Sequence, residues 1–431
     1  MRGSSEAPAV GRKICWRPGH VKTHLLCELS AQLPGDRMEL DLSHPCIEDL
    51  RKTAQKRIPK FAFEYLDSAT GRELGVKVTR DALDSISFLP IVLCGRTTAD
   101  LSCEVLGQEY DLPFGIAPVG MSGLIWAGAE RVLAQAAVQH NIPYCLSSVA
   151  VASPEDVAPH IQGNGWFQHY PVNSPELRQA MLPRIKAAGF HTLIMTVDVP
   201  EESRRERQRR ANLTVPPKAD LRTLWEMVKH PAWCAAHLRE GVMPRMRFFD
   251  DYVPQRGRES FTHAGALIRG IPDWTYLREL RQEWDGKLVV KGVLRPDDAA
   301  RLAAEGVDCI WVSNHSGRQF EAGPAVIDQL PLIRAAVGPS MPLSYDSGVA
   351  WGLDVMRALA KGADFVMLGR AFQYAVAAFG RRGIDHLIHV LRADIAANMS
   401  QLGEQRLDQL SKHLLGAQTA FEPTIQLQKG A

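Results

Sequence analysis

A histidine and an arginine, His315 and Arg318, follow a short apolar run at residues 309–312. The run gives way abruptly to polar and small residues, which predicts that a strand ends there. Alternation along the strand would place Ser313 and His315 on one face and Asn314 on the other. An imidazole transfers protons near neutral pH, and a guanidinium binds a carboxylate through two hydrogen bonds. The pair therefore suits a substrate with a carboxylate and an acidic proton, although a polar strand-to-loop junction would look the same in isolation.

Seven other short apolar runs also end in polar residues or glycine. The eight runs lie at residues 114–117, 143–146, 166–170, 192–197, 288–290, 309–312, 342–345 and 365–368. Amphipathic segments of helical period separate most of them, at 129–140, 175–188, 274–283, 296–305, 325–336 and 353–361. Strands that alternate with helices in this way predict a closed (β/α)₈ barrel, with a doubly wound open sheet as the alternative.

In such a barrel the carboxyl ends of all strands meet at one mouth, where active sites are built. The residues expected there are Pro118, Val119, Gly120, Ser147, Gln168, Tyr170, Thr196, Asp198, Lys291, Ser313, His315, Arg318, Asp346, Ser347, Gly348, Gly369 and Arg370. The last four follow the seventh and eighth strands, where barrels often bind phosphate through backbone amides, although their glycines could also be simple turn residues. No glycine-rich dinucleotide motif or Walker-type loop is present, so a dinucleotide or ATP is not favoured.

The composition is that of an ordinary globular protein. The 431 residues include 50 Lys and Arg against 48 Asp and Glu, so no excess of positive charge favours a nucleic-acid partner. The eight cysteines form no CxxC pair and are expected to be reduced thiols, and no metal site is expected. No apolar run is long enough to span a bilayer, and no secretory signal is recognisable. These features predict a cytoplasmic protein.

The chain is expected to consist of a poorly ordered extension at 1–37 and one barrel domain at 38–431, and translation could begin at Met38. Helices are predicted at 43–57 and 58–67 and from Arg80 onward, and a hairpin around Gly107. A long segment at about 200–271 interrupts the barrel rhythm. It begins with a basic run and contains aromatic and Met residues, so it could act as a lid, a docking surface or a peripheral contact with the inner face of the cell membrane. A helical excursion that packs on the barrel is the simpler expectation.

The motifs resemble those of the FMN-dependent 2-hydroxyacid dehydrogenases and oxidases, the family of glycolate oxidase, L-lactate dehydrogenase and mandelate dehydrogenase. The resemblance runs from about Met38 to the C-terminus and rests on residues 196–198, 288–293, 313–319, 346–348 and 368–371. It implies FMN as the cofactor, oxidation of an L-2-hydroxyacid to the 2-oxoacid, and a homo-oligomer, expected to be a tetramer. Because residues 230–233 are more similar to the dehydrogenases, it also implies that electrons pass to a quinone or another carrier, with a 2-hydroxyacid oxidase that uses oxygen as the alternative.

The resemblance implies a role for each matching residue. His315 would be the catalytic base and Asp198 would stabilise its imidazolium form. The substrate would be bound by Tyr65, Tyr170, Arg205 and Arg318. Lys291 would stabilise negative charge on the reduced flavin. The rest of FMN would be held by Pro118, Val119, Gly120, Ser147, Gln168, Thr196, Ser313, Asp346, Ser347, Gly348, Gly369 and Arg370.

Some positions depart from the family pattern. Ser316 replaces a usual glycine beside the catalytic histidine, and Ala350 stands where an arginine often contacts the phosphate. Val149 lies where oxidases often carry an aromatic residue. The loss of an arginine at position 350 predicts weaker FMN binding. In the substrate loop, Ser203 and Gln208 replace a usual glycine and aspartate, and Arg209 and Arg210 add charge, which predicts a substrate that is larger or more anionic than usual. The changes at Ser316 and Ala350 also keep open a catalytically impaired binding protein. A flavin-dependent isopentenyl-diphosphate isomerase is disfavoured because His315 lies beside Arg318.

Overall fold

The computed structural model describes residues 35–95, 98–212, 220–241, 244–252 and 270–416. The chain divides into two units, residues 1–43 and 44–431. The described part of the first unit is helix α2 (Gly35–Ser43). The predicted extension at 1–37 therefore lies largely outside the described residues. All other elements belong to the second unit.

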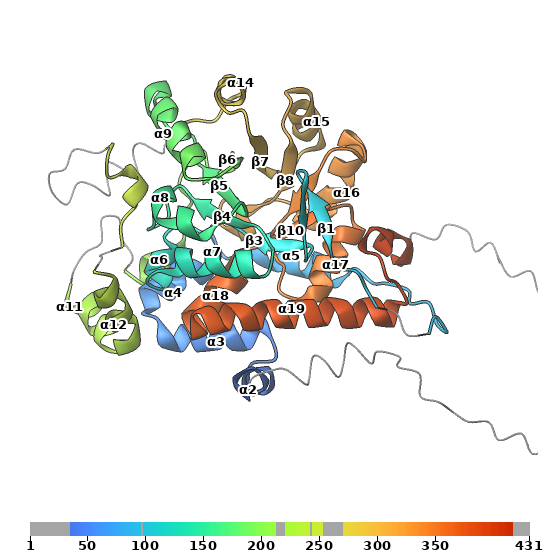
Figure 1. Ribbon diagram of the computed structural model, residues 1–431, viewed down its shortest axis with the longest axis horizontal. Helices are drawn as coiled ribbons and strands as arrows, with labels where there is room; N and C mark the ends of the chain where they lie inside the picture. The colour runs from blue at the N-terminus through green and yellow to red at the C-terminus, as the bar shows by residue number, and fades with distance from the viewer. Residues whose placement is uncertain (1–34, 96–97, 213–219, 242–243, 253–269, 417–431) are drawn as a thin grey trace, which may run out of the picture. The chain divides into compact units, whose positions relative to one another are not determined.

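The second unit is built around a closed barrel of eight parallel strands, with β10 pairing back to β3 (Figure 1). The strands are β3 (Phe114–Ile116), β4 (Tyr144–Ser147), β5 (Gly165–His169), β6 (Thr192–Thr196), β7 (Lys287–Val293), β8 (Cys309–Val312), β9 (Leu343–Tyr345) and β10 (Phe365–Leu368). Each strand overlaps one of the predicted apolar runs. The predicted (β/α)₈ barrel is confirmed, and closure of the strand order excludes the open sheet.

Helices surround the barrel, and six of them match the predicted segments to within one or two residues. These are α7 (Ala129–Gln139), α9 (Pro175–Ala187), α14 (Trp274–Glu283), α15 (Pro296–Ala304), α16 (Val326–Val337) and α17 (Gly352–Ala360). Their starts are encoded locally, since the Ser174 hydroxyl accepts the amide of Leu177 and Asp273 accepts that of Tyr276. The shorter elements are α6 (Ser122–Ile125), α8 (Pro154–Val157), η1 (Ala158–His160), η3 (His315–Gly317) and η4 (Leu407–His413).

Two further helices, α18 (Arg370–Phe379) and α19 (Arg381–Leu402), follow the last strand of the barrel. Figure 1 shows α19 beneath the barrel, and α18 packs against α3 (Ile47–Arg57). The next N-terminal helices are α4 (Lys60–Asp67) and α5 (Leu74–Asp84). The helix expected from Arg80 thus begins six residues earlier. Its first amide, that of Leu74, is capped by the carboxylate of Glu321, a partner 247 residues away that no local pattern reveals.

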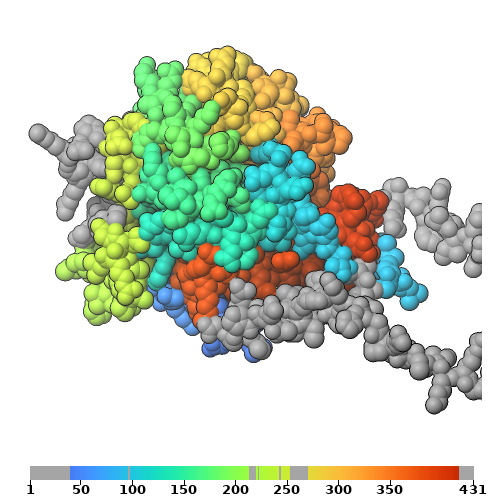
Figure 2. All heavy atoms as spheres, in the orientation of Figure 1, coloured from blue at the N-terminus to red at the C-terminus, as the bar shows by residue number. Residues whose placement is uncertain are grey.

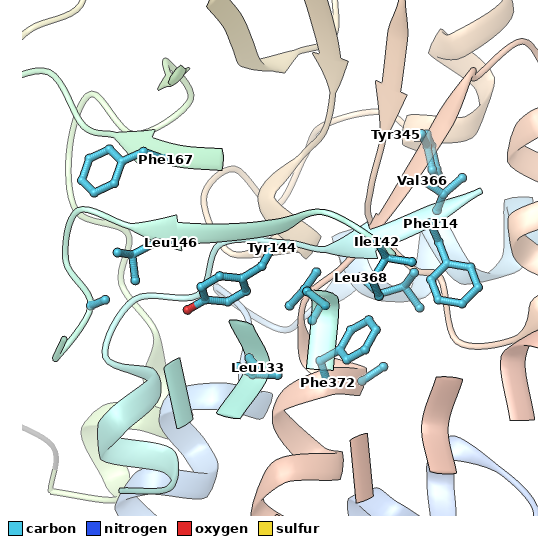
Figure 3. Close-up of a cluster of buried hydrophobic side chains, with 14 of the residues drawn as sticks. Phe114, Leu133, Ile142, Tyr144, Leu146, Phe167, Tyr345, Val366, Leu368 and Phe372 are labelled. Atoms are coloured by element: carbon cyan, nitrogen blue, oxygen red, sulfur yellow. The ribbon is translucent and has the colours of Figure 1, made fainter. Parts of the chain in front are cut away.

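The core has two layers. Inside the barrel, large rings such as Trp166, Trp311 and Phe365 fill the interior beneath the mouth. The hairpin of β1 (Cys103–Val105) and β2 (Gln108–Tyr110), which confirms the predicted turn at Gly107, packs against this cluster. Between the strands and the helices lies a second, larger layer, part of which is drawn in Figure 3. Each fully buried Leu, Ile or Phe contributes about 1.5–3 kcal/mol, so the barrel is a rigid platform for its mouth.

The described residues of the segment at about 200–271 include four short helices. It contains α10 (Glu206–Arg210), α11 (Leu221–Val228), α12 (Pro231–Glu240) and η2 (Arg247–Phe249). The buried Trp233 donates its indole N–H to the carbonyl of Leu124, and Phe248 and Phe249 are also buried. The predicted helical excursion that packs on the barrel is therefore observed, and Met243 lies outside the described residues. In the described part of the chain, no helix is long and apolar enough to cross a membrane.

Candidate active site

A cavity of about 340 Å³ opens at the carboxyl ends of the strands, within the size range of ligand sites. Each strand, or the segment that directly follows it, contributes a residue to the wall of the cavity. The predicted residues that line it are Tyr65, Pro118, Val119, Gly120, Ser147, Gln168, Tyr170, Thr196, Arg205, Lys291, His315, Arg318, Asp346, Ser347, Gly348, Gly369 and Arg370. The other two, Asp198 and Ser313, lie directly behind this wall and bond to His315 and Lys291. A second cavity, of about 360 Å³, lies between α14 and α15 and contains none of these residues.

His315 and Asp198 form a pair at the cavity wall. The Nδ1 atom of the imidazole lies 3.2 Å from both carboxylate oxygens, which leaves Nε2 for a reacting molecule. Burial lowers the pKa of His315, and the opposing effect of the Asp198 charge does not reverse this. The imidazole is therefore neutral at pH 7 and able to accept a proton.

A bulge in β7 lies against Asp198. The pairing of β7 with β8 shifts between Lys291 and Val293, and Gly292 between them has a φ of +104°. A Cβ atom at position 292 would lie 2.5 Å from the Cβ of Asp198, so only glycine fits there. Burial alone would raise the pKa of Asp198, but the charges of His315 and Lys291 outweigh burial and lower it. The carboxylate is thus ionised beside its imidazole.

Two arginines at the mouth have no acidic partner among the described residues. Arg318 donates to the carbonyl oxygens of Tyr65 and Leu66, at 2.9 and 3.1 Å, and Arg205 donates to the hydroxyl of Ser203 at 3.1 Å. Burial, reinforced by the charge of Arg205, lowers the pKa of Arg318 to about 9. Two neighbouring guanidinium groups without a counter-ion form a site for an anion such as a carboxylate.

Lys291 lies at the end of β7 within a compact polar network. Its Nζ atom is 3.1 Å from Asp346 and donates to the Ser313 hydroxyl at 2.8 Å. Across β4, β5 and β6, the Ser147 hydroxyl donates to Gln168, whose amide group donates to Thr196. A cation and a row of amide and hydroxyl groups therefore line one side of the cavity.

Comparison with known proteins agrees with this geometry. Residues 54–417 match the family model described as FMN-dependent dehydrogenase. The chain belongs to this family. It is 35% identical to the (S)-mandelate dehydrogenase of Pseudomonas putida over 372 residues, 86% of this chain and 93% of that protein. It is 34% identical to the L-lactate dehydrogenase of Alcaligenes faecalis over 372 residues, 85% of this chain and 97% of that one.

Solved structures of the family share the same barrel. A monotopic membrane protein, (S)-mandelate dehydrogenase, superposes with a TM-score of 0.80 at 35% identity, covering 86% of this chain and 98% of that chain. A mutant mandelate oxidase with (S)-mandelic acid superposes with a TM-score of 0.72 at 26% identity, covering 86% of this chain and 97% of that chain. The cofactor of the family is FMN, and the chain is an FMN-dependent oxidoreductase.

The cavity residues fit FMN. The row of Ser147, Gln168 and Thr196 can hydrogen-bond the polar edge of a flavin ring, and Lys291 provides positive charge there. Arg370 donates to the carbonyl oxygen of Ser316 at 3.2 Å, while its buried Nε has no partner among the described residues. Such a guanidinium, at the N-terminus of α18, suits a phosphate group.

The arginine that Ala350 replaces has a partial substitute. Arg80, from α5, lines the cavity and donates to the carbonyl of Gly348 at 2.8 Å. Its charge is already neutralised by Asp354, at 2.7 Å, and that carboxylate also accepts the amide of Ala350. Arg80 therefore shapes the turn without adding net charge.

A second group that sequence patterns did not reveal holds the substrate loop. Arg207 forms ion pairs with Glu64 and Asp67 at 2.6 Å and with Glu73 at 3.2 Å. These pairs join α10 to α4 and to the start of α5, so Arg205 is presented to the mouth by an anchored loop. The basic run at 204–210 predicted positive charge in this loop, but only the fold shows that Arg207 forms ion pairs.

Proposed function

We propose that the chain oxidises an L-2-hydroxyacid to the 2-oxoacid and passes the electrons to a quinone or another carrier. The observation that carries this proposal is the His315–Asp198 pair beside two arginines that have no acidic partner in the described part of the chain. A base and a carboxylate site at one mouth suit an acid whose reacting carbon lies next to its carboxylate. The mandelate and lactate dehydrogenases among the relatives support the same substrate class.

Each side chain then has a defined task. Arg205 and Arg318 bind the substrate carboxylate, and Tyr65 and Tyr170 hydrogen-bond the substrate from the cavity wall. His315 accepts one substrate proton at Nε2, and Asp198 stabilises the imidazolium that results. FMN, when bound, supplies the acceptor for the two electrons, and Lys291 favours the negative charge of the reduced ring.

The proposal is tested by anaerobic flavin bleaching. Purified protein should carry FMN, and (S)-mandelate or L-lactate should bleach its absorption. We expect His315→Gln to retain FMN and lose the bleaching, because no other described group at that position accepts a proton. A flavin that no L-2-hydroxyacid bleaches would refute the proposal and favour a binding role. Reoxidation of the bleached enzyme by a quinone analogue, compared with air, separates a dehydrogenase from an oxidase.

We further propose that the protein associates peripherally with the cytoplasmic face of a membrane through α11. This helix is amphipathic, and the side chains of Leu221, Trp225 and Val228 are 86, 63 and 68% exposed. Leu238 of α12 is 81% exposed. Figure 2 shows the two helices at the lower left margin of the molecule, where they can meet a flat surface. A similar structure is that of a monotopic membrane protein.

Sedimentation with anionic lipid vesicles tests this contact. Replacing Leu221, Trp225 and Val228 together by Gln should release the protein into the supernatant, because the apolar face is lost. The matched control replaces Ile91, Val92 and Leu93 by Gln, since these residues are 55, 76 and 101% exposed on another segment. Equal binding by both triple variants would contradict the assignment.

The homo-oligomer, expected to be a tetramer, stays a prediction, and light scattering of the purified protein would measure its mass.

A further inference from the structure

Ser347 adopts a backbone conformation that disfavours its own side chain. Its φ is +90°, in the region where glycine is the ordinary residue, and the residue is 3% exposed. A non-glycine residue held there is strained, and such strain persists where the side chain does something that glycine cannot. The hydroxyl group is the only part of Ser347 that glycine lacks and that forms hydrogen bonds.

The Ser347 hydroxyl bonds to both neighbours of His315. It accepts the amide of Asn314 at 3.3 Å and the amide of Ser316 at 3.2 Å. The amide of His315 itself is accepted by the Ser313 hydroxyl at 3.0 Å. Two serine side chains thus hold three successive amides of the loop that carries the histidine.

Both hydroxyls are oriented by one carboxylate oxygen. Ser313 and Ser347 donate to Oδ1 of Asp346, at 2.5 and 2.8 Å, so their lone pairs face the amides. Asp346 is fixed in turn by Lys291, at 3.1 Å. This network links the cation at the end of β7 to the histidine loop after β8.

The loop needs such support because its own conformation is unfavourable. His315 and Ser316 have φ values of +56° and +55°, and Gly317 follows at +71°. Successive left-handed residues that are not glycine cost about 1–2 kcal/mol each. Without external hydrogen bonds the loop would relax, and the imidazole would move relative to Asp198.

We propose that Ser347 is a positioning residue, whose hydroxyl fixes the left-handed loop and so aims the His315 imidazole at the substrate. This inference rests on the proposed role of His315 as the base. It assigns to Ser347 a task other than contact with FMN. The task is carried through the backbone of residues 314–316 and not through the cofactor.

The test compares Ser347→Gly with Ser347→Ala. Glycine removes both the hydroxyl and the strain, whereas alanine removes the hydroxyl and retains the strain. We expect both variants to melt below the wild type, because buried amides lose their acceptor, and the alanine variant to melt below the glycine variant, because only alanine retains the strain. The flavin of both variants should bleach about 10- to 100-fold more slowly at saturating substrate, because the His315 imidazole is displaced from its position beside the substrate proton. The KM and the FMN content should be unchanged.

Hydrogen–deuterium exchange gives a readout independent of turnover. A peptide covering residues 309–320 should exchange faster in both variants, since the amides of Asn314 and Ser316 lose their acceptor. The control is Gln162→Gly, an exposed residue with a φ of +40° in the turn before β5, which should leave both the bleaching rate and this peptide unchanged.

The outcomes separate the possibilities. A Ser347→Gly enzyme with wild-type bleaching and exchange would overturn the proposal. Loss of FMN, or a higher KM at unchanged maximal rate, would also overturn it, because Ser347 would then act on a ligand. If the wild type itself fails to bleach, the proposed function falls, while unchanged exchange in the two variants would still refute the loop contact.

Discussion

Replacing Asp198 by Asn removes one charge beside the proposed base and keeps the shape of the side chain. The carboxylate oxygens lie 3.2 Å from Nδ1 of His315. At about 4 Å between charge centres and an effective dielectric constant near 20, the attraction between carboxylate and imidazolium is about 4 kcal/mol. Since each ~1.4 kcal/mol in the barrier is tenfold in rate, we expect flavin bleaching to slow by up to about 10³-fold.

The pH dependence of kcat/KM tests the direction of the Asp198 effect independently of the rate. The charge of Asp198 raises the pKa of His315 against the lowering effect of burial. Without that charge the pKa of His315 falls further, so the acidic limb of kcat/KM moves to lower pH while the plateau drops. Anaerobic stopped-flow bleaching by (S)-mandelate from pH 5 to 9 measures both quantities.

The control is Asp285→Asn, which removes an exposed carboxylate paired with Lys186 on the outside of the barrel. It should leave the bleaching rate and the FMN content as in the wild type. A rate for Asp198→Asn within about threefold of the wild type would show that the imidazolium does not develop in the rate-limiting step. An acidic limb displaced to higher pH would contradict the sign of the coupling.

Three other changes test the surrounding structure. Arg318→Lys should raise KM about 10- to 100-fold, measured by steady-state kinetics, because an ammonium cannot bind a carboxylate through two parallel hydrogen bonds. Gly292→Ala should lower the free energy of unfolding by about 2–3 kcal/mol in urea, since its Cβ would lie 2.5 Å from that of Asp198 and its φ is +104°. Burial lowers the pKa of His169 to about 3, so below pH 6.5 the unfolded chain binds a proton that the folded chain refuses. Stability should therefore fall by about 1.6 kcal/mol more between pH 6.5 and 5 in the wild type than in His169→Gln, measured by urea unfolding.

The barrel and the identity of most mouth residues could be read from the sequence. Strands and helices of a parallel barrel differ clearly in period, and barrel topology alone gathers the residues that follow each strand. The helices α18 and α19, which follow the last strand, were not predicted. Residues 371–378 of α18 are all buried because this helix packs against both α3 and α19, and neither contact can be read from the local sequence.

The conformation of the loop that carries His315 could not be predicted from the local sequence pattern. Strand alternation predicted that Ser313 and His315 would share a face opposite Asn314. Ser313 and His315 do approach the cavity, and Asn314 instead donates to Thr79. Strand alternation does not produce this arrangement, however, because the strand ends at Val312 and a left-handed turn follows. That turn depends on hydrogen bonds to a segment more than thirty residues away, and no propensity of the loop itself encodes them.

The distribution of charge around the cavity explains how one mouth can serve both cofactor and substrate. Lys291 is balanced by Asp346, and Arg80 is balanced by Asp354. Arg205, Arg318 and Arg370 have no acidic partner among the residues described. One carboxylate and one phosphate ester bring about 2.5–3 negative charges at neutral pH, close to what three guanidinium groups can neutralise. Because residue 350 is alanine and the charge of Arg80 is neutralised by Asp354, Arg370 is the guanidinium group left for the phosphate, in line with the weaker FMN binding expected from the sequence.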